Sequence, residues 1–332
     1  MSSRSPRTLA GAVLATALSA FALSSGALHA QTWPTKPVRI VVPAPAGSSL
    51  DFVVRLLGEK LKDRWGQPVV VDPKPGAGGT IGVDVAAKAT DGHTLVIGFP
   101  GPTAYGPFLY KKMPYDVNRD LVPIVLTTTQ PNVLAINASV PAKSVTELIS
   151  YARANPGKLS YASVGNGSSS HLAMELFKSE AGIDVQHVPF NGSPPAALST
   201  ANGDTQMLFA VASGIAPHVQ SGRIRQIAVT SKGRFEPLKD LPAIAESGVP
   251  ALRDFEAVAW NGLFGPSSLS PELVARINAD VNAALADSTV RERLLAAGMA
   301  PGGGSAAAFK SMLEADMKKW GGVIRRLNIQ LD

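Results

Sequence analysis

The feature that most limits the possible folds is a regular alternation of strand-like and helix-like segments in residues 37–98. The run PVRIVV at 37–42 is rich in β-branched residues, which is typical of a strand buried on both faces. An amphipathic helix is expected next, and Gly66 is well placed to end it. The segments VVVD, IGVDVAAKA and HTLVIG then give a strand, a helix and a strand. This βαβαβ order predicts a parallel sheet with helices on its faces.

A second α/β unit is expected after Gln130. The strand-like segments PIVLTTT and NVLAIN flank Gln130 and Pro131, which we interpret as a crossing between lobes. Ser144 and Glu147 have the spacing of a capping box at a helix start. Further strands and a helix are expected in KLSYASV (158–164), His171 to Ser179, VQHVPF (185–190), TQMLFAV and IRQIAVT.

The C-terminal part is expected to return to the first lobe. It has a strand-like AVAWNGLFG and helical segments at 271–286, 288–297 and 305–326, the last interrupted near Gly321 and Gly322. The predicted fold class is therefore α/β, with two doubly wound lobes and a ligand cleft between them, because open α/β sheets bind ligands at strand ends. The predicted boundaries are 31–132 and 256–332 for lobe 1 and 133–255 for lobe 2.

The N-terminus predicts export. Arg4 and Arg7 precede an apolar stretch rich in Ala and Leu that ends in small residues, which is the pattern of a cleaved secretory signal peptide over residues 1–30. The competing interpretation is a retained membrane anchor. We expect a periplasmic protein, whose net charge falls from +6 to +4 because residues 1–30 hold two arginines and no acid.

Composition excludes several functions. At 332 residues, with 45% hydrophobic and 17% charged residues, the chain is long enough for two globular domains. The absence of cysteine excludes disulfides, Cys-ligated zinc and thiol catalysis. Basic residues are scattered without aromatic interleaving, so nucleic acid is not an expected partner.

Two loops suggest a site for an anion. SVGNGSSSH (163–171) and PAPAGSSLD (43–51) each follow a strand and place Gly and Ser where a helix begins. Helix N-termini carry unpaired N–H groups and partial positive charge, and glycine lets a ligand approach the backbone. The alternative for each loop is an ordinary Ser N-cap after a glycine loop. Two such loops facing one cleft would hold a ligand with an anionic group.

No catalytic motif supports an enzyme. The patterns G-x-S-x-G, S-x-x-K, H-E-x-x-H and G-x-x-x-x-G-K-[ST] are absent, and GAGGTIG has the wrong spacing for a dinucleotide fingerprint. His93 and His187 are interpreted as structural, and His171 as either ligand-orienting or packed. Asp51 suits a first helical turn, and would contact a ligand only if it faces the cleft. No catalytic residue, metal or cofactor is predicted.

The sequence resembles the Bug family, the periplasmic solute-binding proteins of tripartite tricarboxylate transporters. The pieces that carry the resemblance span about residues 33–330 and include WPTKPVRIVVPAPAG, PGAGGTIG, DGHTLVIG, KLSYASVGNGSSSHLAMELFK, HVPFNGSPPA and AWNGLFGP. The resemblance implies a type II periplasmic-binding fold whose lobes close on a small organic carboxylate. It also implies transporter membrane subunits as partners.

The resemblance assigns the ligand site by position. The two loops become the anchoring shell, with Ala46, Gly47, Ser48, Ser49 and Asp51 from the first and Ser163, Gly165, Asn166, Gly167, Ser168, Ser169 and His171 from the second. Side walls are expected from Pro102, Thr103 and Ala104 and from Asn191, Gly192 and Ser193.

This chain departs from the family pattern where specificity is decided. Ser48 replaces a common Gly, Leu50 a small polar residue, and Ala210 an acid found in many relatives. Loss of the acid disfavours a ligand with an ammonium group. If Phe99, Tyr105, Phe190 and Leu50 lie nearby, an aromatic or extended mono- or dicarboxylate is favoured.

The predicted function is a non-enzymatic, monomeric ligand trap that delivers its carboxylate to a transporter. One alternative is a sensor that docks a membrane kinase. The other is a periplasmic hydrolase or isomerase in which His171 or another histidine activates Ser168, Ser169 or Ser170.

Overall fold

The computed structural model describes residues 33–331. Contacts divide the chain into two units, residues 1–35 and 36–332, and the strands and helices named below all belong to the second. The predicted signal peptide over residues 1–30 lies outside the described residues. No helix within residues 33–331 has the length and apolar character needed to cross a membrane.

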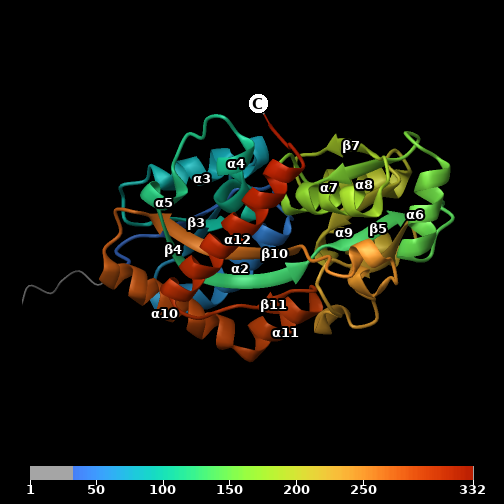
Figure 1. Ribbon diagram of the computed structural model, residues 1–332. Helices are drawn as coiled ribbons and strands as arrows, with labels where there is room; N and C mark the ends of the chain where they lie inside the picture. The colour runs from blue at the N-terminus through green and yellow to red at the C-terminus, as the bar shows by residue number, and fades with distance from the viewer. Residues whose placement is uncertain (1–32, 332) are drawn as a thin grey trace, which may run out of the picture. The chain divides into compact units, whose positions relative to one another are not determined.

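The first sheet is six-stranded and mixed (Figure 1). Its order is β11-β4-β10-β3-β1-β2. The strands are β1 (Val38–Val42), β2 (Val69–Pro73), β3 (Thr94–Gly98), β4 (Leu121–Pro131), β10 (Val258–Pro266) and β11 (Ala300–Pro301). The predicted parallel βαβαβ unit is confirmed, since β1 pairs in parallel with β2 and β3. β10 is antiparallel to both β3 and β4, so the return strand lies inside the sheet.

Helices cover this sheet and form the six-stranded lobe with it. They are α2 (Ser49–Trp65), α3 (Thr80–Ala87), α4 (Gly106–Leu109), α5 (Val117–Asp120), α10 (Pro271–Ala286), α11 (Ser288–Ala296) and α12 (Ala306–Arg326). The irregular turns η1 (Ala77–Gly79) and η2 (Gly101–Tyr105) precede α3 and α4. Gly66 ends α2 at φ 63°, as its sequence position predicted, because a left-handed residue there lets the cap N–H bond Lys62 O.

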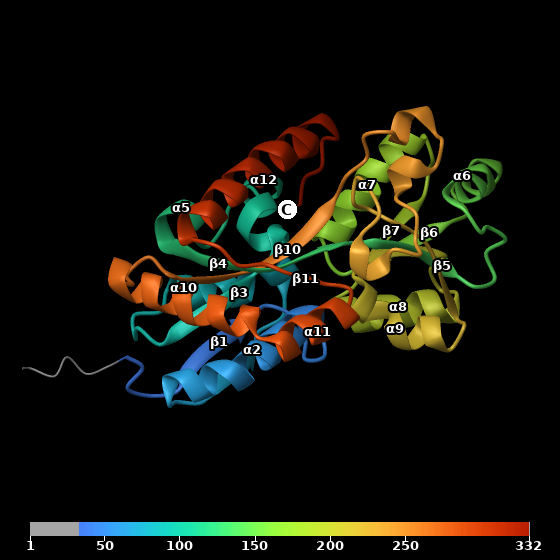
Figure 2. The ribbon, with the colours of Figure 1, turned by 90° about the horizontal axis from the view of Figure 1, so that it is seen from below.

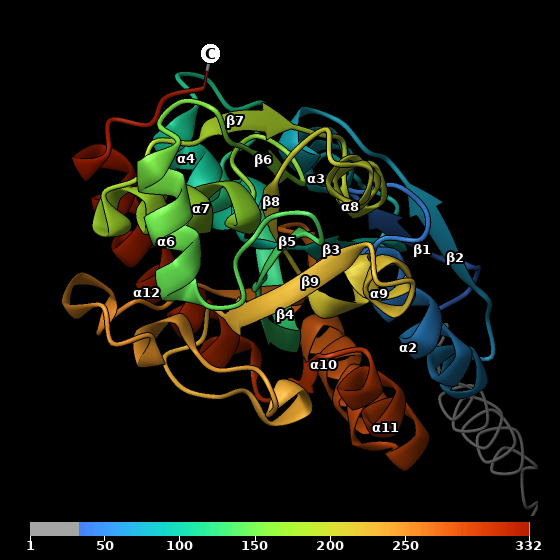
Figure 3. The same cartoon turned by 90° about the vertical axis from the view of Figure 1, so that its right-hand side faces the viewer.

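The second sheet is five-stranded, in the order β7-β6-β8-β5-β9. Its strands are β5 (Val133–Asn137), β6 (Ser160–Ser163), β7 (Gln186–Pro189), β8 (Met207–Ala210) and β9 (Ile224–Val229). The helices α6 (Val145–Ala154), α7 (Ser169–Ala181), α8 (Ser193–Asn202) and α9 (Ala212–Gln220) complete the five-stranded lobe, which faces the viewer in Figure 3. Ser144 caps α6 by accepting a hydrogen bond from Glu147 N.

The chain crosses between the sheets twice, side by side. β4 leads into β5 at Asn132, and the segment after β9 leads back to β10 (Figure 2). Asn132 N donates to Thr230 Oγ1 at 2.8 Å, and Thr230 N donates to Asn132 O at 2.9 Å. Ala257 N also donates to Thr230 O at 2.8 Å. The crossings are therefore bonded to each other, while the residue boundaries of the lobes stay a prediction.

The last helix corrects one expectation. α12 runs from Ala306 to Arg326 without the interruption predicted near Gly321 and Gly322. A Cβ added at Gly321 would lie 2.8 Å from the Phe108 ring. The glycine therefore allows a close approach of α12 to α4 and does not end the helix, because packing outweighs its low helix propensity.

Substitution of Gly321 and of Gly322 by alanine should change stability in opposite directions. Gly322→Ala places its methyl in open space, so we expect the free energy of unfolding to rise by about 0.5–1 kcal/mol. Gly321→Ala meets the Phe108 ring, so we expect a loss of about 1–3 kcal/mol. Urea denaturation of the two variants tests this, and a stable Gly321→Ala would contradict the close packing of α12.

Candidate functional site

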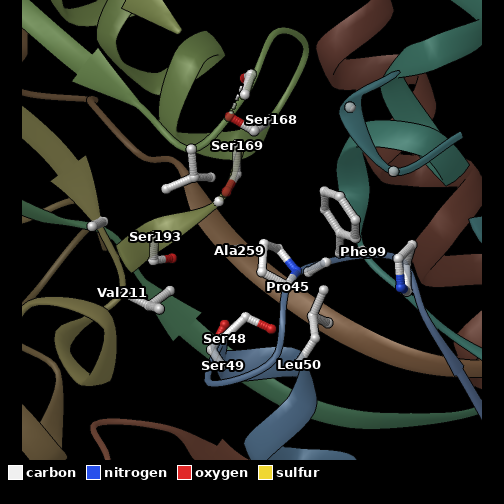
Figure 4. A pocket seen from close by; sticks show the side chains of 18 of the residues that line it. Pro45, Ser48, Ser49, Leu50, Phe99, Ser168, Ser169, Ser193, Val211 and Ala259 are labelled. Carbon is white, nitrogen blue, oxygen red and sulfur yellow. Dashed lines mark hydrogen bonds between the residues drawn. The ribbon is translucent and has the colours of Figure 1, made fainter. Parts of the chain in front are cut away.

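A cavity of about 100 Å³ lies between the two lobes. Figure 4 shows Ser48 and Ser49, from the start of α2, on one side of it and Ser168 and Ser169, from the start of α7, on the opposite side. Leu50, Phe99, Phe190, Val211 and Trp260 add apolar surface. None of the residues lining the cavity is Asp, Glu, Lys, Arg or His. Any charge on a ligand must therefore be balanced by helix termini and backbone dipoles.

The first loop (43–51) is fixed by hydrogen bonds on the side away from the cavity. Ser48 caps α2 by accepting from Asp51 N, and the Asp51 carboxylate accepts from Gly47 N at 3.1 Å. Arg55 donates two hydrogen bonds to the same carboxylate, at 2.9 and 3.0 Å. Burial opposes ionisation of Asp51, but the hydrogen bonds from Arg55 and Gly47 outweigh it and lower the pKa of Asp51. Asp51 therefore positions the loop and does not line the cavity.

The second loop is built around Ser168, which caps α7. Its Oγ accepts from His171 N and donates to Gly165 O at 2.7 Å. Ser170 Oγ accepts from Val164 N at 2.9 Å. α7 begins at Ser169, earlier than predicted, so the serines lie within the helix start. In both α2 and α7 the first N–H groups have no partner within the helix and lie beside the cavity.

A stack of three rings supports the second loop. His171 stacks on His187 at 4.2 Å between ring centroids, and His187 stacks on Tyr161 at 4.7 Å. His171 Nδ1 accepts from Gly167 N at 3.1 Å, which requires the neutral tautomer protonated at Nε2. Burial lowers the pKa of His171 to about 4, with Lys178 adding to the effect. Burial, then His171, lowers the pKa of His187 to about 3.

The Ser–His contact of this region does not face the cavity. Ser163 Oγ lies 2.7 Å from His187 Nε2, but Ser163 is fully buried and does not line the cavity. The Ser168 hydroxyl is bonded to Gly165 O, and among the described residues its other partners are Ser170 Oγ and the backbone His171 N, not a histidine ring. The geometry needed for a serine nucleophile facing the cavity is therefore not formed by these residues.

The structure brings part of the predicted site together. The predicted residues that line the cavity are Ser48, Ser49, Gly165, Ser168, Ser169, Asn191, Gly192 and Ser193. The predicted residues that do not line it are Ala46, Gly47, Asp51, Pro102, Thr103, Ala104, Ser163, Asn166, Gly167 and His171. Most of the second group lie just behind the cavity wall, in the loops that position it.

The residues of the side wall predicted at Pro102–Ala104 do not line the cavity. All three residues are buried in η2, where Thr103 Oγ1 donates to Phe99 O at 2.6 Å and Tyr115 donates to Pro102 O. They support Phe99, which itself lines the cavity as anticipated with Leu50 and Phe190. Tyr105 does not line it, because its ring is fully buried against Trp320.

Sequence reasoning did not identify the cavity residues at the crossings. These are Gln130, Asn132, Ala259, Trp260 and Asn261. The prediction that Gln130 and Pro131 mark a crossing between lobes was the one signal pointing to them, since crossings border the cleft. The cavity is also lined by Pro43, Ala44 and Pro45 at the start of the first loop and by Pro75, Gly76, Gly78 and Gly79 between β2 and α3, which were not among the predicted site residues.

The lobes approach each other closely at glycines. A Cβ added at Gly78 would lie 2.7 Å from Asn166 O, and one added at Gly192 would lie 2.8 Å from Pro45 Cδ. A Cβ at Gly101 would lie 3.0 Å from Gly167 O. Each contact joins the six-stranded lobe to the five-stranded lobe, so larger residues there would separate the lobes.

Within residues 33–331 no group of His, Asp or Glu is arranged to hold a metal ion.

Comparison with known proteins agrees with this geometry. Residues 53–329 match the model of the tripartite tricarboxylate transporter family receptor. BugT of Bordetella pertussis is 33% identical over 306 residues, which is 92% of this chain and 93% of BugT. Rpa4515 of R. palustris, solved with adipate, is 36% identical with a TM-score of 0.86, covering 90% of this chain and 100% of its own.

The periplasmic binding protein BugD is a further structural relative, at 28% identity and a TM-score of 0.84, covering 90% of this chain and 100% of BugD. The likeness to these structures confirms the predicted α/β periplasmic-binding fold with two lobes. It also confirms the resemblance to the Bug family.

Proposed function

Because the chain belongs to the tripartite tricarboxylate transporter family of receptors, we propose that it captures a small organic carboxylate between its lobes and delivers it to a membrane transporter. The observation that carries the proposal is the pair of helix N-termini, α2 and α7, on opposite sides of one uncharged cavity. Each N-terminus offers unpaired N–H groups and partial positive charge, which favour an anion.

The binding chemistry follows from this arrangement. A carboxylate between the helices accepts hydrogen bonds from backbone N–H groups near Ser49 and Ser169. Hydrogen bonds to a charged group contribute about 1.5–3 kcal/mol each. A few of them, with apolar contact to Phe99 and Phe190, support a Kd near micromolar, about 8 kcal/mol. A ligand that touches both lobes favours the form in which they are close.

The proposed function also implies where the protein is located and which proteins it binds. We place the protein in the periplasm as a monomer, exported by the N-terminal segment and docking transporter subunits when loaded. The relative Rpa4515 was solved with adipate, and BugD is described as a periplasmic binding protein. We propose no chemical reaction, since the serine hydroxyl at Ser168 is engaged in the loop.

Calorimetric titration of ligand-stripped protein tests the function. The panel is adipate, citrate, aspartate, glutamate, nicotinate and terephthalate, with hexane-1,6-diol as the uncharged match to adipate. We expect saturable, one-site binding of at least one carboxylate at micromolar Kd, no binding of the diol, and no product by NMR. Binding of no carboxylate, or turnover of a bound one, would refute the proposal.

A further inference from the structure

Two uncharged side chains of the cavity carry hydrogen-bonding atoms that the protein does not use. Gln130 is 2% exposed and Asn132 is 1% exposed, and both line the cavity. Within the described residues, Gln130 Oε1 and Asn132 Nδ2 are buried without a hydrogen-bond partner. A buried polar group left unpaired costs about 1–3 kcal/mol, so an acceptor and a donor left together in a cavity indicate a partner from outside the chain.

The strand pairing shows where Gln130 points. Ala259 in β10 lies directly opposite Gln130 in β4. Residues directly opposite each other project from the same face of a sheet. Figure 4 shows the Ala259 side chain at the cavity, so the Gln130 side chain projects toward the cavity as well.

Asn132 is fixed at the crossing by its backbone. Its N–H donates to Thr230 Oγ1 and its carbonyl accepts from Thr230 N. Thr230 Oγ1 in turn donates to Ala257 O at 2.7 Å, in the returning segment. The main chain of Asn132 is thus fully bonded, and only its side-chain amide is left for another partner.

We propose that Gln130 and Asn132 select carboxylates that carry a second, uncharged group able to donate and accept a hydrogen bond, such as a hydroxyl. A hydroxyl donates to Gln130 Oε1 and accepts from Asn132 Nδ2, which satisfies both atoms. A second carboxylate at this point has no cationic side chain in the cavity lining to balance its charge. The inference rests on the proposed function, because the helix N-termini hold the first carboxylate.

The experiment uses two matched pairs of ligands, so that chain shape does not decide the outcome. Hexanoate is compared with 6-hydroxyhexanoate, and benzoate with 4-hydroxybenzoate, by calorimetry on the purified protein. In at least one pair we expect the hydroxylated member to bind about tenfold more tightly, the effect of one or two satisfied hydrogen bonds.

Variants assign the preference to the two amides. Gln130→Leu and Asn132→Leu are each expected to reduce the hydroxyl advantage, which is the ratio of the two affinities within a pair, to less than about threefold. The control is Gln226→Leu, in β9 outside the cavity lining, which is expected to keep the full advantage. In the unmodified protein, the Asn132 side-chain NH₂ signals should shift in NMR spectra with the hydroxylated ligand only, which gives a readout that needs no variant to fold.

The outcomes separate this inference from the proposed function. Equal affinities within both pairs would overturn selection by the amides, and would mean that water satisfies them, while the carboxylate site stands. The same follows if the two Leu variants keep the hydroxyl advantage. If the unmodified protein binds neither these acids nor any carboxylate of the panel, the proposed function fails and this inference with it.

Discussion

Gly78→Val is expected to weaken carboxylate binding by roughly 10- to 100-fold, because it separates the lobes. A Cβ at this position would lie 2.7 Å from Asn166 O in the opposite lobe. That atom belongs to the backbone of the second loop, so it cannot move aside as a side chain would. Binding is measured by calorimetry with the best ligand of the panel, and compaction on ligand addition by small-angle X-ray scattering.

Gly92→Val is the matched control for backbone strain. Gly92 has φ +62° and Gly78 has φ +63°, so valine strains both backbones alike, but a Cβ at Gly92 has no atom within 4 Å. Backbone strain alone should cost each variant about 1–2 kcal/mol of unfolding free energy. Only Gly78→Val should lose affinity and ligand-induced compaction. Full affinity in Gly78→Val would show that the ligand does not need the lobes this close.

The stacked histidines should make the protein less stable in mild acid. The pKa of His171 is lowered to about 4 and that of His187 to about 3, both below the ordinary value of 6.5. Below pH 6.5 these two histidines are therefore protonated in the unfolded chain but stay neutral in the folded protein. Stability contributed by the neutral rings is complete above pH 6.5 and is lost as the pH falls toward 4, by about 1 kcal/mol per pH unit for each histidine.

Urea denaturation from pH 7 to pH 5 measures this slope. His187→Phe keeps a ring in the stack and removes one titrating group, so the fall in the free energy of unfolding between pH 6.5 and 5 should shrink by about half of the histidine contribution. The quantity to compare is the change in the free energy of unfolding with pH. The stability at a single pH is not suitable, because His187→Phe also loses the contact with Ser163 and is less stable at every pH. An unchanged slope would mean that His187 does not resist protonation in the folded protein.

Local features of the site could be predicted well because they depend on a few adjacent residues. A serine N-cap was the alternative interpretation of each loop, and Ser48 and Ser168 are such caps. Gly66 predicted a helix end for the same reason, since a left-handed residue there is a property of one position. The paired loops at strand ends likewise followed from the βαβ order.

Which face of each loop meets the cavity could not be predicted. His171 lies in the loop segment thought to hold the ligand, yet its ring faces His187 and its Nδ1 accepts from Gly167 N. Asp51 turns away toward Arg55. Both outcomes depend on partners that spacing along the chain leaves open, so the sequence alone allowed either orientation.

By itself, the sequence determined the α/β class, the two loops and the caps that begin their helices, because hydrophobic period and capping act over one or two turns of chain. Only the tertiary structure decided that β10 enters the first sheet beside β4, some 130 residues away in the chain at Asn261 and Thr127. That pairing brings Ala259 opposite Gln130 and places the unpaired amides in the cavity. Strand order is set by burial and hydrogen bonding between distant segments, and no local pattern carries that information.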